Sequence, residues 1–162
     1  MEDFSPDSWE EYFDELMEKS NEMTKVVEEY YTNGFSMSVK DLIDLRSRLN
    51  VASYFVSEAL LPVAMSAPYW RIRIAKAKEE AMPEAINKFG GVTAARELIE
   101  SMESVSKAYK IRGLIEATIS TVKLSISAAE NVSHAIVGKI KGNDITELRN
   151  DDNKPTETFG GW

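Results

Sequence analysis

The chain has 162 residues, a length that suits one domain with a sizeable core and requires neither disulfides nor a structural metal. It contains no cysteine, which excludes a disulfide framework and suits a reducing compartment. The first residues, MEDF, are acidic and lack the basic and apolar regions of a secretory signal, so we expect a cytoplasmic protein.

The formal net charge of −8 is unevenly distributed along the chain. Residues 1–30 hold 11 acidic and 2 basic side chains, for a net charge of −9. Residues 31–141 hold 11 acidic and 15 basic side chains, for +4, and residues 142–162 hold 5 and 2, for −3. An acidic N-terminal segment and an acidic tail therefore flank a mildly basic body.

The first predicted helix starts at Ser5-Pro6-Asp7-Ser8, where a capping serine precedes proline in the first helical position. Apolar residues then recur at alternating intervals of four and three, and Thr32-Asn33-Gly34 ends the helix. The positions of this stripe are Trp9, Phe13, Leu16, Ser20, Met23, Val27 and Tyr30.

A second helix is predicted to start at Ser38, with Asp41 completing a short capping box. Its stripe keeps the same spacing and is apolar throughout, and Pro62 and Pro68 should kink or end it. A third, shorter helix is predicted over residues 69–82, closed by Met82-Pro83 and followed by a break at Gly90-Gly91. The stripe of the second helix is Leu42, Leu45, Leu49, Ala52, Val56, Ala59 and Val63.

The stretch from Val51 to Trp70 is about as long as a membrane span. It contains Glu58, two prolines and three serines, which disfavour a span. We therefore expect no membrane partner.

A long final helix is predicted from Thr93 to residue 141, because one heptad register runs from Leu98 to Ile140 and ten of its thirteen positions are apolar. Such a helix would be about 74 Å long, too long for a compact monomer with a radius of gyration of about 15 Å. A break at Gly113 is the alternative, but the register passes through it unchanged, which favours a continuous helix. We expect this register to form a homo-oligomer seam, through Ile115, Ile119, Val122, Ile126, Ile136 and Ile140.

These elements predict an all-α fold of three to four helices with a long heptad-patterned C-terminal helix, assembled as an oligomeric helical bundle. Three parts are expected: an acidic N-terminal helix over residues 1–34, a helical core with the oligomerisation helix over residues 35–142, and a flexible acidic tail over residues 143–162.

Signatures of enzymes are missing from the sequence. It has no nucleotide-binding glycine motif and no cysteine nucleophile, so we expect a non-enzymatic protein without a cofactor. The single histidine, His134, follows Glu130 by four residues, where a di-iron site needs two copies of a three-residue spacing, and it is interpreted as a surface or interface residue. The acidic face of the first helix, Glu10, Glu11, Asp14, Glu15 and Glu18, lacks the loop spacing of a calcium site and is expected to be solvated.

The stretch SAPYWRIRIAKAKEE, residues 66–80, combines aromatic and basic residues. On a helix Trp70 would face the core and leave Tyr69 and four cations at the surface, while solvated cations on an amphipathic helix are the simpler interpretation. Contact with single-stranded nucleic acid needs cations beside an aromatic platform. The candidate residues are Tyr69, Arg71, Arg73, Lys76 and Lys78, together with Lys107 and Lys110 of the long helix.

The tail, DDNKPTETFGGW, resembles the C-terminal peptides through which single-stranded DNA-binding proteins recruit partners, although it is less acidic and ends in Trp rather than Phe. The resemblance implies that Phe159 and Trp162 contact a protein partner. An ordinary disordered terminus is the alternative.

Residues 40–141 resemble, in their order, small phage recombination mediators of the UvsY type. The order is a helix with RLNVASYFVSEAL, a basic helix with WRIRIAKAKEE, a glycine break and a long helix ending AAENVSHAIVGKI. This resemblance implies a helical closed oligomer that binds single-stranded DNA and helps to load a recombinase. The acidic first helix and the acidic tail depart from the family.

The leading hypothesis is therefore a non-enzymatic accessory protein of single-stranded DNA metabolism, with DNA on the basic body and a recombinase or other protein partner on the acidic segments. A structural or assembly oligomer, such as a phage virion or scaffold component, is one alternative. An acidic adaptor or inhibitor of a basic partner is another.

Overall fold

The computed structural model describes residues 9–151, with side chains over residues 9–142. All of its regular elements are helices, and the described residues contain no strand, which confirms the all-α prediction. The elements are α1 (Trp9–Asn33), α2 (Val39–Phe89), α3 (Val92–Leu98), a short 3-10 helix η2 (Ile99–Ser101) and α4 (Glu103–Asp151).

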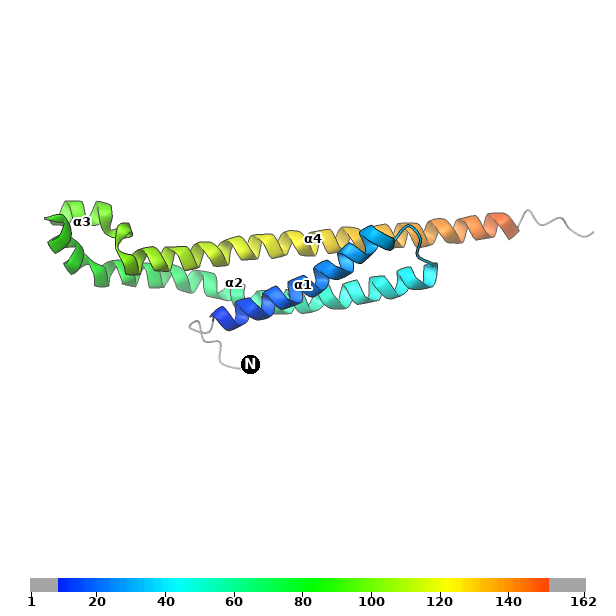
Figure 1. The fold of residues 1–162 in the computed structure, drawn as a ribbon, viewed down its shortest axis with the longest axis horizontal. Coiled ribbons are helices and arrows are strands. Elements are labelled where there is room, and N and C mark those ends of the chain that lie inside the picture. Colours follow the sequence, from blue (N-terminus) through cyan, green and yellow to red (C-terminus); the bar gives the residue numbers. More distant parts are fainter. Residues whose placement is uncertain (1–8, 152–162) are drawn as a thin grey trace, which may run out of the picture.

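Two long helices set the shape of the molecule. The 51 residues of α2 and the 49 residues of α4 lie antiparallel along most of their length, and α3 and η2 close the turn between them. The shorter α1 packs mainly on α2 and also contacts α4, over one half of this hairpin (Figure 1). The other half is not covered by α1, and its two long segments, α2 from Arg71 to Phe89 and α4 from Glu103 to Arg112, are called the arm below.

The start of α2 follows the sequence prediction. The Ser38 hydroxyl accepts the backbone N–H of Asp41 at 3.2 Å, and the Asp41 carboxylate accepts the backbone N–H of Ser38 at 3.3 Å. This reciprocal pair is a capping box, which satisfies two backbone donors that a helix start leaves free.

Pro62 and Pro68, predicted to kink or end this helix, do not end it. One helix continues through Pro62, Pro68 and Pro83 to Phe89, so the separate helix predicted over residues 69–82 is part of α2. Each proline removes a donor and frees a carbonyl four residues earlier. Pro68 and Pro83 lie at exposed positions and Pro62 is half-buried, so water can reach the freed carbonyls while the buried faces keep the helix packed.

The long final helix exists, but it is shifted along the sequence. It starts at Glu103 instead of Thr93, because α3 and η2 turn the chain first and Met102 has an extended backbone with ψ of 136°. Gly91, and not Thr93, precedes α3, and no side chain caps that helix. The helix is continuous through Gly113, as the unbroken register predicted.

At its other end α4 runs beyond the predicted boundary at residue 142, as far as Asp151. A helix that is already nucleated can add residues at little cost, so a polar sequence does not by itself end it. The predicted partner contacts, Phe159 and Trp162, lie outside the described residues.

The heptad residues of α4 form the core within the chain. Ile115, Val122 and Ile136 are fully or almost fully buried against the chain's own helices. The other three residues of the predicted seam, Ile119, Ile126 and Ile140, are half-buried and pack against the same core, which also contains Leu16 and Met23 of α1. The structure thus uses the seam predicted for oligomerisation to join α4 to α2, and it makes α1 part of one core with both.

A second, smaller core closes the tip of the arm. It contains small residues of α2 and α3 and the first apolar residues after them, namely Ala81, Ala85, Ala95, Ile99, Met102 and Val105. The chain reverses at Gly90, whose φ of 78° is in the left-handed region that favours glycine.

One helix of the described chain, α2, contains a segment long and apolar enough to cross a membrane by its length and composition. A third of that segment is buried inside the protein, and the core helix of a soluble protein meets the same description.

Candidate functional site

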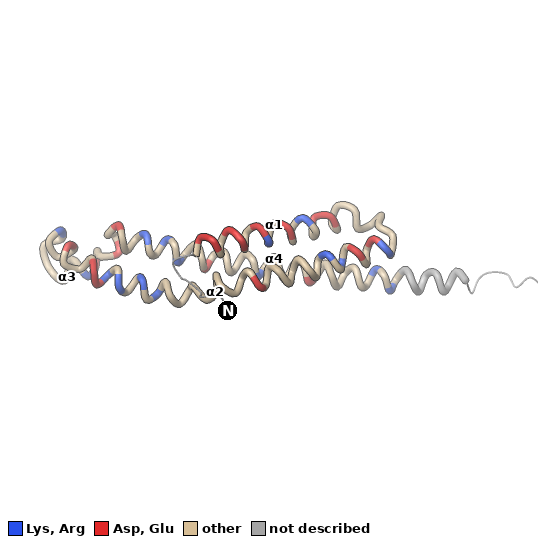
Figure 2. The backbone as a smooth tube through the Cα atoms, turned by 90° about the horizontal axis from the view of Figure 1, so that it is seen from below, with Lys and Arg blue, Asp and Glu red and all other residues tan. Residues whose placement is uncertain are grey.

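The two halves of the hairpin differ in charge. The α1 segment Trp9–Asn33 carries eight carboxylates and two lysines, and Figure 2 shows acidic residues along most of its length. In the half of the hairpin that α1 leaves uncovered, residues 69–78 of α2 and 104–112 of α4 together carry seven Lys or Arg residues and no carboxylate. Because α2 and α4 are antiparallel, these two basic stretches lie side by side at the start of the arm (Figure 2).

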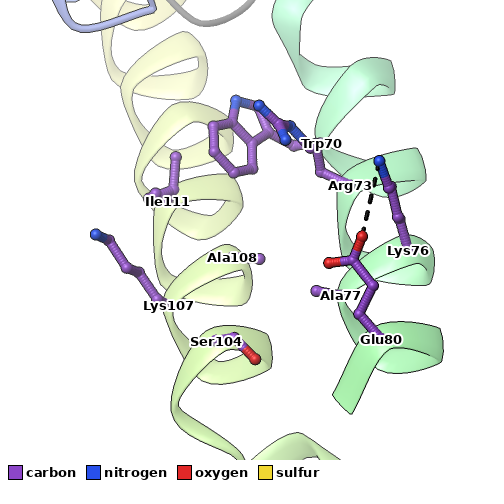
Figure 3. A pocket seen from close by; sticks show the side chains of 9 residues that line it. All are labelled: Trp70, Arg73, Lys76, Ala77, Glu80, Ser104, Lys107, Ala108 and Ile111. Carbon is purple, nitrogen blue, oxygen red and sulfur yellow. Dashed lines mark ion pairs between the residues drawn. The ribbon is translucent and has the colours of Figure 1, made fainter. Parts of the chain in front are cut away.

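A groove between α2 and α4 lies in this basic region, next to the start of α1 at Trp9. Its volume is about 200 Å³. Figure 3 shows the side chains that line it, with Trp70 at one end and Ser104 at the other. The lining residues are Trp70, Arg73, Lys76, Ala77 and Glu80 from α2, and Ser104, Lys107, Ala108 and Ile111 from α4; this set is called the cationic groove below.

Trp70 closes the groove at the side of α1. The side chain is 8 % exposed, as expected for a core-facing residue, and its ring makes edge-to-face contacts with Trp9 at 6.3 Å and with Tyr69 at 6.2 Å between centroids. The indole therefore has fixed neighbours on two sides. Its buried N–H has no acceptor among the described residues.

Arg73 crosses from the core to the groove. It is half-buried, and its guanidinium carbon lies 5.4 Å from the centroid of the Tyr69 ring, within cation–π range. Tyr69 is itself half-buried and packs on the core. The structure thus makes Tyr69 a support for Arg73 and not an open platform for a base.

Lys76 and Lys107 are the exposed cations of the groove, one on each helix. The Lys76 ammonium lies 3.7 Å from the Glu80 carboxylate, a solvent-exposed pair on one helix that contributes little to stability. Lys107 has no ion pair with any described residue. Both side chains can therefore turn toward an anion in the groove, and Figure 3 shows them on opposite sides of it.

Lys78, by contrast, is already paired within the chain. Its ammonium donates to the Glu100 carboxylate at 2.7 Å and lies 5.2 Å from the centroid of the Tyr109 ring. The Tyr109 hydroxyl donates to the same carboxylate at 2.9 Å. The hydrogen bonds to Glu100 and Tyr109 raise the pKa of Lys78, and the bonds from Lys78 and Tyr109 lower the pKa of Glu100.

The structure therefore divides the residues singled out by sequence. Arg73, Lys76 and Lys107 come together in the cationic groove. Arg71 and Lys110 are exposed but do not line it, and Lys78 is paired with Glu100. The groove also contains residues that sequence reasoning did not assign to a site: Trp70, Ala77, Glu80, Ser104, Ala108 and Ile111.

Those missed residues carried a signal in the sequence. Trp70 and Ala77 are seven residues apart in α2, and Ala108 and Ile111 are three apart in α4. Residues at these spacings lie on one face of a helix, the face that packs against a partner helix. The alanines are small, which leaves space between the two backbones. Knowing which α4 residues face which α2 residues, however, requires the register of the hairpin.

The other candidates for chemistry lie apart from the groove. His134 is exposed and lines a shallow hollow with Glu130 and Ser133 of α4 and Asn50 and Ser53 of α2. Nearby, the Arg46 side chain donates to the Ser133 hydroxyl at 3.2 Å, which in turn donates to the Asn50 side chain at 3.3 Å. Within the described residues no group of three or more His, Asp and Glu side chains could hold a metal ion.

Comparison with protein-family models, with curated proteins and with solved structures finds no match. The function is therefore inferred from the geometry and charge of the cationic groove and of the surfaces around it.

Proposed function

We propose that the protein is a non-enzymatic accessory factor of single-stranded DNA metabolism, and that the cationic groove holds the phosphate backbone. The observation that carries this proposal is the pair of basic stretches on α2 and α4, with seven cations, which meet across a groove lined by three cations, Arg73, Lys76 and Lys107, and one carboxylate, Glu80. A polyanion is the ligand that such a surface attracts most strongly.

The groove favours the backbone of the nucleic acid over its bases. Trp70 is buried and Tyr69 is covered by Arg73, so neither offers an open face for stacking. Binding would then depend on ionic contacts and show little preference for sequence.

The acidic α1 has a different role in this proposal. Its carboxylates lie next to the groove along the same hairpin and repel nucleic acid, so they confine DNA to the arm (Figure 2). A basic surface of a protein partner, such as a recombinase, is the complementary ligand for α1. A role as recombination mediator joins both contacts in one molecule.

The first experiment measures binding of a fluorescent oligothymidylate to the full chain at two salt concentrations. If three or four phosphates are neutralised, affinity should fall about 20- to 50-fold between 50 and 200 mM salt, because counterion release gives single strands a slope of about 0.7 per phosphate. No detectable binding at 50 mM salt would overturn the proposal.

Charge reversal then locates the contact. The double variant Lys76→Glu/Lys107→Glu should lose most of the affinity at 50 mM salt. The variant Lys40→Glu/Lys123→Glu makes the same change of charge at two exposed positions outside the groove. Equal loss in both variants would show attraction by net charge alone and contradict a site in the groove.

A structural or assembly protein is the second candidate, and an exposed apolar stripe on α2, described below, is the observation that favours it. Such a protein would still assemble with Lys76→Glu/Lys107→Glu, because those residues lie off the apolar stripe, although the loss of arm cations would weaken the contact with an acidic partner surface. An unaltered chain that assembles but binds no oligonucleotide at 50 mM salt would therefore select this candidate.

A further inference from the structure

The outer side of α2 presents a row of large apolar side chains to solvent. Five of them, Val51, Tyr54, Leu61, Met65 and Ile72, are each at least half exposed; they are called the outer stripe below. No described side chain of α1 or α4 covers them, because the core residues of α2, such as Leu49, Val56, Val63 and Trp70, lie on the opposite side of the helix. Exposed apolar surface of this extent marks an interaction site in most soluble proteins.

The spacing of the outer stripe is that of a helix that pairs with another helix. Positions 51, 54, 58, 61, 65, 68 and 72 alternate by three and four residues, and five of the seven hold the stripe residues. Glu58 and Pro68 fill the other two. A period of 3.5 residues over three heptads is the pattern of a helix-pairing seam. The core face of α2 already uses one such register for α4, and the outer stripe is a second one.

The outer stripe is also large enough for a stable pair. Five side chains that are half exposed or more present on the order of 600 Å². Two copies together would bury roughly 1,200 Å², the lower end of the range for specific interfaces. Between Val51 and Ile72 the only side chains charged at neutral pH are Glu58 and Arg71, so few charges lose their hydration on pairing.

We propose that the outer stripe binds a second copy of this chain, with the two α2 helices antiparallel. Charge complementarity selects this occupant and this direction. Each copy has an acidic half, where α1 lies on α2, and a basic half in the arm. Antiparallel pairing places the basic arm of one copy beside the acidic half of the other, whereas parallel pairing would set like charges side by side.

The consequence for DNA rests on the proposed function. An antiparallel pair carries one cationic groove toward each end, so one DNA strand that reaches both is held by two weak sites. Two linked sites bind more tightly than either one, because the second contact is intramolecular.

The first test measures mass in solution by sedimentation or light scattering at about 50 µM. We expect about 36 kDa, twice the chain mass of 18.2 kDa, for the unaltered chain. Leu61→Glu should return the mass to that of one chain. Leu124→Glu is the matched control, since Leu124 of α4 is 73 % exposed and Leu61 is 60 % exposed. A monomeric unaltered chain, or dissociation by Leu124→Glu alone, would overturn the proposal.

The direction of pairing is tested by cross-linking, for which the absence of cysteine is an advantage. Under oxidation, a mixture of Val51→Cys and Ile72→Cys chains should form the mixed disulfide dimer. Val51→Cys alone should not form a dimer, because position 51 meets itself only in a parallel pair. A dimer of Val51→Cys alone would contradict the antiparallel arrangement.

Two further outcomes separate this proposal from the proposed function and from a membrane. A Leu61→Glu monomer that still binds oligonucleotide weakly supports both proposals, and a dimer that binds none keeps the pairing but overturns the DNA role. The third measurement is flotation with vesicles of zwitterionic and anionic lipid. If the unaltered chain floats with the vesicles, Leu61→Glu does not, and the mass of the unaltered chain in solution is that of one chain, the stripe binds a membrane and the pairing proposal is overturned.

Discussion

Ser38 and Asp41 show how one pair of side chains determines where a helix of 51 residues begins. The Ser38 hydroxyl also donates to the Asp41 carboxylate at 2.6 Å, so the carboxylate receives one bond from the hydroxyl and one from the backbone. These two bonds lower the pKa of Asp41 below its ordinary value of 3.8. The folded state therefore favours the ionised carboxylate.

We expect Ser38→Ala to lower the free energy of unfolding by about 1 kcal/mol at neutral pH, because the helix start loses its cap. A pKa that is lower in the folded state gives stability that is present above the unfolded value and lost as the pH falls through the folded value. The difference between the unaltered chain and Asp41→Asn should therefore shrink below about pH 4. Urea unfolding at pH 6 and pH 3 measures both effects, and a constant difference would contradict the capping role of the carboxylate.

The sequence identified candidate residues of the site, but it did not show which of them line the groove and which are paired elsewhere in the chain. Arg73, Lys76, Lys78 and Lys107 all have the same charge and similar surroundings in the printed sequence. The pairing of Lys78 with Glu100 joins residues 22 positions apart across the turn of the hairpin. This ion pair depends on how α2 is aligned with the chain beyond Gly90, and no local sequence pattern reveals that alignment.

At the scale of elements, periodicity located the buried faces of α1, α2 and α4, but it misjudged several helix ends and missed the buried residue Ile99. The heptad stripes of α2 and α4 are the ones that pack, and the breaks at Asn33-Gly34 and Gly90-Gly91 lie where turn residues predicted them. Pro62 and Pro68 did not end α2, because packing on both neighbours outweighs a lost hydrogen bond on the solvent side. The segment after Thr93 did not join α4, because Ile99 and Met102 instead complete the core at the tip.

Two glycines of these elements give opposite predictions for the same substitution. Gly90 ends α2 with a φ of 78°, where a side chain is strained, so Gly90→Ala should destabilise by about 1 kcal/mol. Gly113 lies within the continuous α4, and a Cβ there would meet nothing within 4 Å, so Gly113→Ala should stabilise by about 0.5–1 kcal/mol. Thermal unfolding of both variants measures the pair. Destabilisation by Gly113→Ala would show that α4 is broken at that position in solution.

The whole molecule is a rod because its two longest helices lie against each other along most of their length (Figure 1). The sequence predicted this elongation from a single helix too long for a compact domain. It assigned the heptad face of that helix to contacts between subunits, since a register shows that a helix has a partner but not which chain supplies it. Here the partner is α2 of the same chain, and the surface left for a second copy is on the other side of α2.

Small-angle X-ray scattering can test the rod and the proposed pairing together. The 51 residues of α2 span about 77 Å, and a rod of that length has a radius of gyration of about 22 Å. Because α4 runs past the start of α2, we expect about 25 Å, against about 15 Å for a compact domain of this length. A value near 15 Å would contradict the extended hairpin.

Pairing along the outer stripe should change mass without much change in length. The midpoint between Val51 and Ile72 lies within about three residues of the midpoint of α2, so antiparallel copies are offset by less than about 10 Å. The dimer should therefore keep a radius of gyration near 25 Å while its scattering mass doubles and its cross-section grows. Association end to end would instead nearly double the radius of gyration, which would contradict a seam along α2. The Leu61→Glu chain should show the same length with half the mass per unit length, and that comparison separates a thicker rod from a longer one.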